Sequence, residues 1–250
     1  MPGGDHGDIE LWLVDLARSW MLLDAIEGRA AVLTGDDRQR AEAISDATLR
    51  RERRATYIAL RVLLERRLGL TTRGVAIVRT PAGKPALAGL PIAFSLAHAD
   101  GVALIALGAR EPIGVDIEVE RRAAIAEPRR DGMLAAARGL AGAELAAGLA
   151  PEAMQLSAWV RLEAFAKATG DGVARLLGSL GLFGVERALA PSLVVIEQRA
   201  TRLAEMHAIA VSDIAGVIGA VAVARGLTVP ALQHFPTDWT AWRALCAVDG

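Results

Sequence analysis

The order of apolar segments along the chain restricts its fold more than any other sequence feature. Strands are expected at residues 9–16, 75–79, 92–96, 102–107 and 113–119 and within 193–224, and helices at residues 38–44, 47–68 and 154–169 and within 125–148. Strands and helices therefore come in blocks, which favours an α+β fold over alternating βαβ units. We predict two α+β halves, residues 1–110 and 111–228, and a tail, residues 229–250, that packs on the body.

Local signals support several of these boundaries. In the helix predicted at 47–68, Tyr57, Leu60 and Leu64 lie on one face, and Gly69 follows as a stop signal. The strands at 102–107 and 113–119 are separated by a connection of hairpin length, so we expect them to pair.

Composition excludes several classes of protein. The chain has 250 residues, of which 53% are hydrophobic and 23% charged, so it is long and apolar enough for a globular core. A net charge of −1 provides no overall attraction to nucleic acid or to an anionic membrane. The single cysteine, Cys246, has no partner for an internal disulfide, which indicates a reducing cytoplasm.

Residues 206–224 are nearly apolar and about long enough to cross a bilayer. They include Asp213, which is costly at the middle of a membrane. We therefore predict two buried strands joined by a turn at Ser212 and Asp213, and no membrane span.

Two acidic residues alternate with apolar ones in Gly114-Val115-Asp116-Ile117-Glu118. Residues i and i+2 of a strand face the same side, so Asp116 and Glu118 stand side by side while Val115 and Ile117 face the core. Neighbouring carboxylates repel each other unless a cation lies between them, and Mg²⁺ prefers such oxygen ligands. The pair also fits an edge strand with two solvated acids, and it does not by itself decide between these interpretations.

The helix predicted at 154–169 carries a second group of polar residues. Trp159, Glu163 and Lys167 are spaced by four, so they line one face of the helix. Taken alone, Glu163 and Lys167 are more typical of an ordinary surface ion pair, worth roughly a few tenths of a kcal/mol.

Lys84 and Lys167 are the only lysines among 28 basic residues, and the others are arginine. An ammonium is not interchangeable with a guanidinium at a tight phosphate or proton-transfer site, so both lysines are candidates for function. Lys84 lies in a turn-rich loop and His98 at the end of a predicted strand, where they can bind phosphate oxygens together. Taken alone, His98 is more typical of a structural hydrogen bond.

Four motifs occur in one order: Gly-Lys-Pro at 83–85, Phe-Ser-x-x-His at 94–98, Gly-Val-Asp-Ile-Glu at 114–118 and Trp-x-x-x-Glu-Ala-x-x-Lys-Ala-x-Gly at 159–170. In this combination the chain resembles the 4′-phosphopantetheinyl transferases, in particular the larger, surfactin-synthetase-activating class. The resemblance extends over about residues 33–224. That family transfers phosphopantetheine from coenzyme A to a serine of a carrier protein.

The resemblance implies a fold and a metal site. The fold would consist of two similar subdomains related by a pseudo-twofold axis, each with helices and a small, mainly antiparallel sheet, and coenzyme A would lie between them. Asp116, Glu118 and Glu163 match the Mg²⁺ ligands. Glu163 and Lys167 match the residues at the reacting centre, where Glu163 is the candidate base for the carrier serine and Lys167 neutralises or protonates the leaving group.

The resemblance also implies contacts to coenzyme A. Lys84, His98 and Arg40 match positions that contact its phosphates. The family often has an arginine where this chain has Thr56, and Arg53, one turn earlier on the same helix, is the candidate substitute.

Two further positions depart from the family pattern. Leu162 replaces a lysine that often precedes the helix glutamate, and Ala97 replaces a serine that often precedes the histidine. These departures leave open a non-catalytic relative that binds coenzyme A or a carrier protein without turnover. The chain has no Walker A loop, no Gly-x-Ser-x-Gly elbow, no dinucleotide glycine fingerprint and no zinc-ligand spacing.

The expected partners follow from the same resemblance. An apo acyl or peptidyl carrier protein, of fatty-acid, polyketide or nonribosomal-peptide type, would be the acceptor, and coenzyme A the donor. We expect no nucleic acid and no membrane as partner. Because both halves of the cleft belong to one chain, we expect a monomer.

Overall fold

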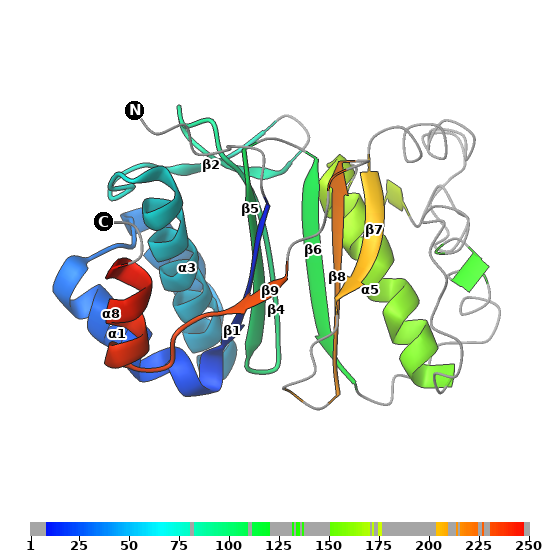
Figure 1. Ribbon diagram of the computed structural model, residues 1–250, viewed down its shortest axis with the longest axis horizontal. Coiled ribbons are helices and arrows are strands. Elements are labelled where there is room, and N and C mark those ends of the chain that lie inside the picture. Colours follow the sequence, from blue (N-terminus) through cyan, green and yellow to red (C-terminus); the bar gives the residue numbers. More distant parts are fainter. Residues whose placement is uncertain are drawn as a thin grey trace.

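The computed structural model describes residues 9–80, 83–109, 112–120, 151–170, 204–209, 216–224 and 231–247, and the single residues 132, 134, 135, 137, 172, 175, 176, 214 and 227. Within this part of the chain, two main sheets lie side by side with helices on their outer faces (Figure 1). The first sheet has the order β4 (Ala93–Ala99), β5 (Val102–Gly108), β1 (Glu10–Asp15) and β9 (Leu232–His234), and the second the order β6 (Ile113–Val119), β8 (Val217–Ala224) and β7 (Ala204–Ile209). The predicted α+β class is confirmed.

The two sheets bury an apolar layer between them because side chains alternate along each strand. On β5, Leu104 belongs to the layer between the sheets, whereas Ile105 packs toward the helices. On β6, Val115 and Ile117 join the layer between the sheets, as predicted. The alternation places Asp116 on the other face of β6.

Two helices, α1 (Leu16–Ala30) and α3 (Ala47–Leu68), cover the outer face of the first sheet (Figure 1). The carboxylates of Asp15 and Asp46 accept backbone N–H groups of the first turns of these helices, which is the usual N-cap. Helix α3 has the predicted bounds, and it ends at Gly69, whose φ of 63° suits glycine.

Helix α2 (Gly35–Glu42) begins three residues before the predicted start of the helix at 38–44. Thr34 and Asp37 form a capping box there, which fixes the true beginning. No helix is predicted from the sequence over α1, although Leu22 and Ile26, which are spaced by four, both face the core.

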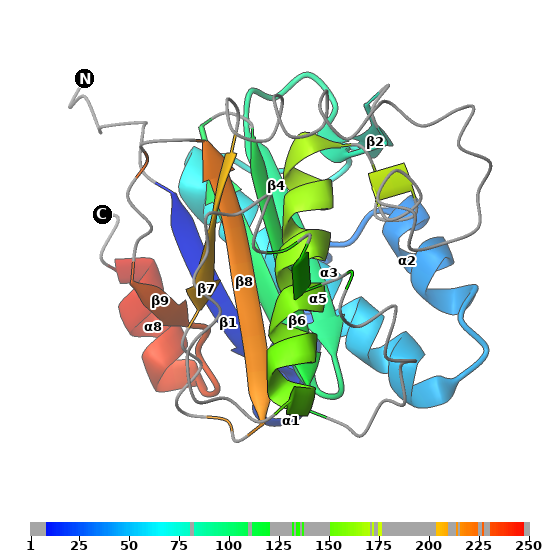
Figure 2. The same cartoon turned by 90° about the vertical axis from the view of Figure 1, so that its right-hand side faces the viewer.

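Helix α5 (Pro151–Thr169) lies along the outer face of β6 and β8 (Figure 2). Its end at Thr169 agrees with the predicted helix at 154–169. Strands β7 and β8 are antiparallel neighbours, as the two-strand interpretation of residues 206–224 requires. The turn predicted at Ser212 and Asp213 lies outside the described residues, as does most of 125–148 and all of 193–203.

No helix among the described residues is both long and apolar enough to cross a membrane.

The predicted hairpin between β5 and β6 is wrong. Both edges of β5 are occupied, by β4 on one side and β1 on the other, so it has no hydrogen bonds left for β6. Strand β6 pairs with β8 in the second sheet instead. The true hairpin joins β4 to β5 through Asp100 and Gly101, which both have positive φ, 39° and 87°.

A small ribbon and the tail complete the fold. The ribbon consists of β2 (Ile77–Arg79), where a strand was expected at 75–79, and β3 (Pro85–Leu87). In the tail, β9 pairs in parallel with β1, and α8 (Trp239–Ala247) packs Trp242 against the core beneath the first sheet.

Candidate metal centre and surrounding cavity

Three carboxylates from β6 and α5 meet at one point. Asp116, Glu118 and Glu163 each offer an oxygen, and these oxygens all lie within 4.8 Å of one another. Asp116 is only 3% exposed, and the other two acids are half-buried. Asp116 is therefore buried and not solvated, although β6 lies at an edge of its sheet within the described residues, and the structure brings the strand pair together with Glu163 of the helix.

Gly114 explains why the strand and the helix approach so closely. A Cβ at this position would overlap the carbonyl oxygen of Ala164 and the backbone nitrogen of Ala168, so only glycine fits. Backbone contact between β6 and α5 shortens the distance that the side chains must bridge. As a result, the carboxylate of Asp116, two residues after Gly114 on the same face, lies close to that of Glu163.

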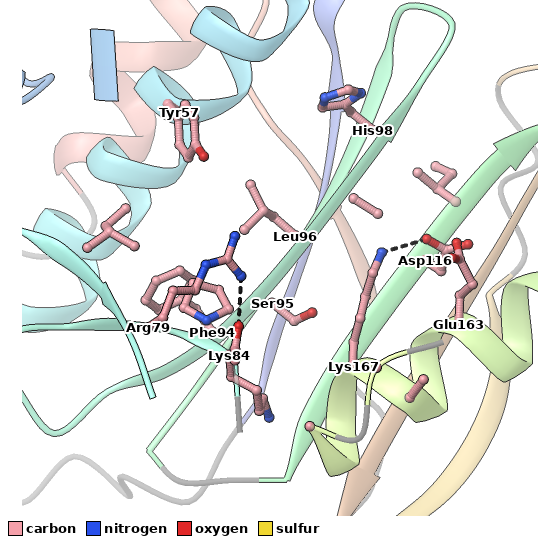
Figure 3. A pocket seen from close by; sticks show the side chains of 18 of the residues that line it. Tyr57, Arg79, Lys84, Phe94, Ser95, Leu96, His98, Asp116, Glu163 and Lys167 are labelled. Atoms are coloured by element: carbon pink, nitrogen blue, oxygen red, sulfur yellow. Dashed lines mark hydrogen bonds and ion pairs between the residues drawn. The ribbon is translucent and has the colours of Figure 1, made fainter. Parts of the chain in front are cut away.

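Lys167 is bonded to Asp116 and not to its helix neighbour Glu163. Its Nζ lies 2.7 Å from Asp116 Oδ1 (Figure 3). The interpretation of Glu163 and Lys167 as an ordinary surface pair is therefore wrong. Burial raises the pKa of the Asp116 carboxyl well above its usual range, the Lys167 ammonium lowers it, and the nearby Glu163 raises it again.

The acidic cluster fits a cation. Asp116 Oδ2 is buried and has no hydrogen-bond partner among the residues that the structure describes. An unpartnered buried oxygen beside two further carboxylates is costly unless a positive charge satisfies it. All three donors are hard carboxylate oxygens, which suit Mg²⁺, Mn²⁺ or Ca²⁺ better than softer metals.

The cluster forms one wall of a cavity of about 470 Å³. Residues of α2, α3, β4 and the β2–β3 ribbon line the opposite wall (Figure 3). The cavity is lined by every residue singled out from the sequence for metal, phosphate or catalysis: Arg40, Arg53, Lys84, His98, Asp116, Glu118, Glu163 and Lys167. Cationic groups thus face an acidic cluster across a space large enough for part of a small-molecule ligand.

His98 lies near the end of β4 and is half-buried. Burial, together with the positive charges of Arg53 and Lys167, lowers its pKa to about 4, against a backbone hydrogen bond that raises it. The imidazole is therefore neutral at pH 7. Its Nε2 is buried without a hydrogen-bond partner within the described part of the chain, so it is available to a ligand.

Two arginines line the wall opposite the acids. The Arg53 guanidinium lies 5.9 Å from the centre of the Tyr57 ring, and its Nε is buried without a partner among the described residues. Arg40 Nη2 donates to the carbonyl of Ile77 at 3.0 Å, and Asp37 lies 3.8 Å from its Nη1. Arg53 is thus the less satisfied of the two.

The Lys84 side chain bonds backbone oxygens of the second half of the chain. Its Nζ donates to the carbonyl oxygens of Ile113 at 3.2 Å and Ala168 at 3.0 Å. Burial lowers the pKa of its ammonium to about 8. The structure therefore holds Lys84 at the backbones of β6 and α5.

The three positions that depart from the pattern of the resembled family lie in different surroundings. Thr56 is fully buried, and its hydroxyl donates to the carbonyl of Glu52, so it does not line the cavity. Leu162 is buried against the second sheet, where a charged side chain would be unfavourable. Ala97 does line the cavity.

No role in the site was assigned from the sequence to Arg79, Tyr57 or Ser95, which all line the cavity. Arg79, at the end of β2, adds a cation to the cavity, and Tyr57 appeared only as an apolar position on a helix face. The Ser95 hydroxyl accepts the N–H of Val115 at 3.0 Å, which ties β4 to β6. Arg79 carried a signal in the sequence as a cation beside the Gly-Lys-Pro turn, and Ser95 as part of the Phe-Ser-x-x-His motif.

Comparison of the sequence with models of known protein families, and with curated proteins, found no match. Function must accordingly be inferred from the cavity and from the order of the motifs that line it.

Proposed function

We propose that this protein is a Mg²⁺-dependent 4′-phosphopantetheinyl transferase that modifies a serine of an acyl or peptidyl carrier protein. The observation that carries the proposal is the cavity, in which Asp116, Glu118 and Glu163 face His98 and Arg53. A ligand that is both metal-bound and polyanionic suits such a cavity, and the pyrophosphate of coenzyme A has these properties.

The proposal includes the two-subdomain fold of the family. Each main sheet carries helices on its outer face, and the cavity is lined from both sheets, which supports such an arrangement. It also includes a monomer, since one chain supplies both walls of the cavity. The proposed location is the cytoplasm.

Asp116, Glu118 and Glu163 would hold the metal ion. When bound there, Mg²⁺ supplies positive charge that orients the pyrophosphate oxygens and offsets charge developing on them. The chain's own contribution is to keep the three carboxylates together, through the contact of Gly114 with α5.

In the reaction, the serine oxygen of the carrier bonds to the β-phosphorus of coenzyme A. The bond from that phosphorus to the bridging oxygen breaks, and adenosine 3′,5′-bisphosphate leaves. Glu163, directly or through a water molecule, accepts the serine proton. Lys167 neutralises or protonates the leaving phosphate. Positioning and electrostatics supply most of the catalysis in such transfers.

The cationic wall would bind the phosphates. His98 Nε2 and Arg53 Nε both lack partners among the described residues, so a phosphate oxygen would satisfy buried groups that are otherwise costly. Arg40 and Arg79 add positive charge to the cavity lining. Arg53 would take the place of the arginine that the family often has at Thr56.

The test is transfer itself. Incubation with coenzyme A, Mg²⁺ and a panel of apo carrier proteins should add one phosphopantetheine group to at least one carrier, as measured by mass spectrometry. Asp116→Ala and Glu163→Gln should abolish transfer, whereas Glu152→Gln, on the same helix but exposed, should not.

If no carrier protein in the panel were modified, that result would contradict the proposed transferase activity. If the protein still bound coenzyme A in that case, the non-catalytic alternative would replace it. Transfer that survived Asp116→Ala would contradict the assignment of the metal site.

A further inference from the structure

Lys84 connects three elements that are distant in sequence. It lies just before β3, and its Nζ donates to the carbonyls of Ile113, 29 residues away, and Ala168, 84 residues away. Ile113 is the first residue of β6 and Ala168 is in the last turn of α5. One side chain therefore joins the ribbon of the first half to both elements that carry the acidic cluster.

The contact with α5 is favourable for a physical reason. The last carbonyl groups of a helix have no partner within the helix, and a cation near that end is stabilised by the helix dipole. Ala168 provides one of these carbonyls, and the helix ends one residue later at Thr169. The Lys84 ammonium thus caps the end of α5, with two of its three donors directed at backbone oxygens.

This cap lies next to the place where β6 and α5 touch. Gly114 follows Ile113 directly, and a Cβ on it would overlap the backbone of Ala168. The geometry between β6 and α5 is thus set by a close approach at Gly114 and by a cation that bonds both sides of the same contact.

The residue beside this cap belongs to the candidate reacting centre. Lys167 directly precedes Ala168, and its Nζ reaches Asp116 Oδ1 at 2.7 Å. Any rotation or shift at the end of α5 would move Lys167 and the candidate metal ligand Glu163, which are both on α5, relative to Asp116. A displacement of about 1 Å at such a site can cost on the order of a hundredfold in rate.

We infer that Lys84 is a positioning residue: it fixes the end of α5 against β6 and so holds Lys167 and Glu163 in register with Asp116. The metal-site part of this inference is independent of the reaction, and its catalytic part rests on the proposed transferase function. It differs from the direct phosphate contact that the family resemblance implies for Lys84.

The two roles predict opposite results for metal binding. Mn²⁺ binding to the purified protein is measured by calorimetry for Lys167→Met and for the same variant with Lys84→Met or Lys84→Arg added, so that no ammonium competes with the metal for Asp116. If Lys84 were only a nearby positive charge, its removal would tighten Mn²⁺ binding. As a positioning residue, Lys84→Met weakens it about tenfold, the scale seen when groups that orient metal ligands are removed. Lys84→Arg, which keeps donors for the carbonyls, recovers part of the loss.

Kinetics provide the second readout. Lys84→Met should lower kcat with KM for coenzyme A changed less than about twofold, whereas loss of a phosphate contact would raise KM. Arg73→Met, which removes an exposed cation outside the cavity, is the matched control. Unchanged or tighter Mn²⁺ binding, or a raised KM with unchanged kcat, would overturn the inference.

A third measurement needs no variant, so it remains decisive even where Lys84→Met does not fold. In a crystal structure of the wild type with coenzyme A and Mg²⁺, Lys84 Nζ should still bond Ile113 and Ala168. A Nζ that had left both carbonyls for a phosphate would overturn the inference. If the wild type modifies no carrier, the transferase proposal fails, while the Mn²⁺ titration still tests the role of Lys84.

Discussion

Lys167 and Asp116 form an ion pair of 2.7 Å at the centre of the acidic cluster. The lysine side chain is 36% exposed, whereas the aspartate side chain is 5% exposed. The ammonium therefore reaches in from the cavity and neutralises a buried carboxylate. Lys167 thus occupies the position of a counter-ion to Asp116, and a metal ion would compete with it for the same oxygen.

The first prediction concerns this competition. Lys167→Met should bind Mn²⁺ about tenfold more tightly than wild type, equivalent to about 1.4 kcal/mol, because no ammonium has to be displaced from Asp116. The same variant should lose transfer activity. Calorimetry measures the affinity, and Lys167→Arg, which keeps the charge, should not show the gain. Equal Mn²⁺ affinity of Lys167→Met and wild type would show that the ion pair does not oppose metal binding.

The second prediction concerns the contact of β6 with α5. Gly114→Ala should lower the free energy of unfolding by about 3 kcal/mol or more, since a Cβ there would overlap the backbone of α5. Mn²⁺ affinity should fall with it because the carboxylates move apart. Urea denaturation measures the stability.

Gly28→Ala is the matched control for that substitution. Gly28 is helical and nothing lies within 4 Å of a Cβ placed there, so alanine should stabilise the protein by roughly 0.5–1 kcal/mol. A well-folded Gly114→Ala protein with wild-type Mn²⁺ affinity would contradict the close-approach argument.

The third prediction concerns the protonation of His98. Its imidazole should titrate with a pKa near 4, below the ordinary 6.5, in an NMR titration assigned with His98→Gln. Between pH 6.5 and 4 the unfolded chain binds a proton that the folded protein does not, so His98 lowers the stability as the pH falls through this window. His98→Gln should remove that part of the pH dependence.

Binding of coenzyme A should raise the pKa of His98, because a phosphate favours the imidazolium. A value near 6.5 in the free protein, or one that coenzyme A does not change, would contradict the placement of His98 in the phosphate site.

The fourth prediction concerns the buried pair that holds α2 on α3. Arg61 Nη2 lies 2.7 Å from Asp37 Oδ2, both side chains are fully buried, and Arg61 also donates to the carbonyls of Thr72 and Val75. Arg61→Met should cost about 3–5 kcal/mol, since it leaves the Asp37 charge buried without its partner.

Denaturation measures this cost, and Arg54→Met provides the comparison. Arg54 pairs with Asp24 at the same 2.7 Å but on the surface, so its loss should cost less than about 1 kcal/mol. Similar costs for Arg61→Met and Arg54→Met would show that burial of the ion pair adds nothing.

Local features of the fold could be predicted because the signals that specify them lie in short segments. Helix α3 has its predicted bounds since Asp46 and Gly69 cap it from adjacent positions. Helix α1 was missed although its apolar spacing is visible in the sequence. The pairing of β5 with β6 was predicted wrongly because connection length carries no information about which strands already occupy the two edges of β5.

The candidate site also has a part that local sequence patterns predict and a part that they do not. Strand periodicity alone places Asp116 beside Glu118, with Val115 and Ile117 in the core. Motif order singled out Glu163, and only the packing of α5 on β6 brings it within 4.8 Å of the strand acids. Two partners could not be predicted: Lys167 bonds Asp116, 51 residues away, in preference to its helix neighbour, and Lys84 bonds backbone carbonyls.

The sequence by itself determined which residues share a face of a strand or a helix, because these periodicities depend only on backbone geometry within a few residues. The tertiary structure decided which faces meet. Gly114 allows β6 and α5 to touch, and that contact determines the partners of Asp116, Lys167 and Lys84. Such contacts depend on packing across the whole fold, so no local pattern specifies them.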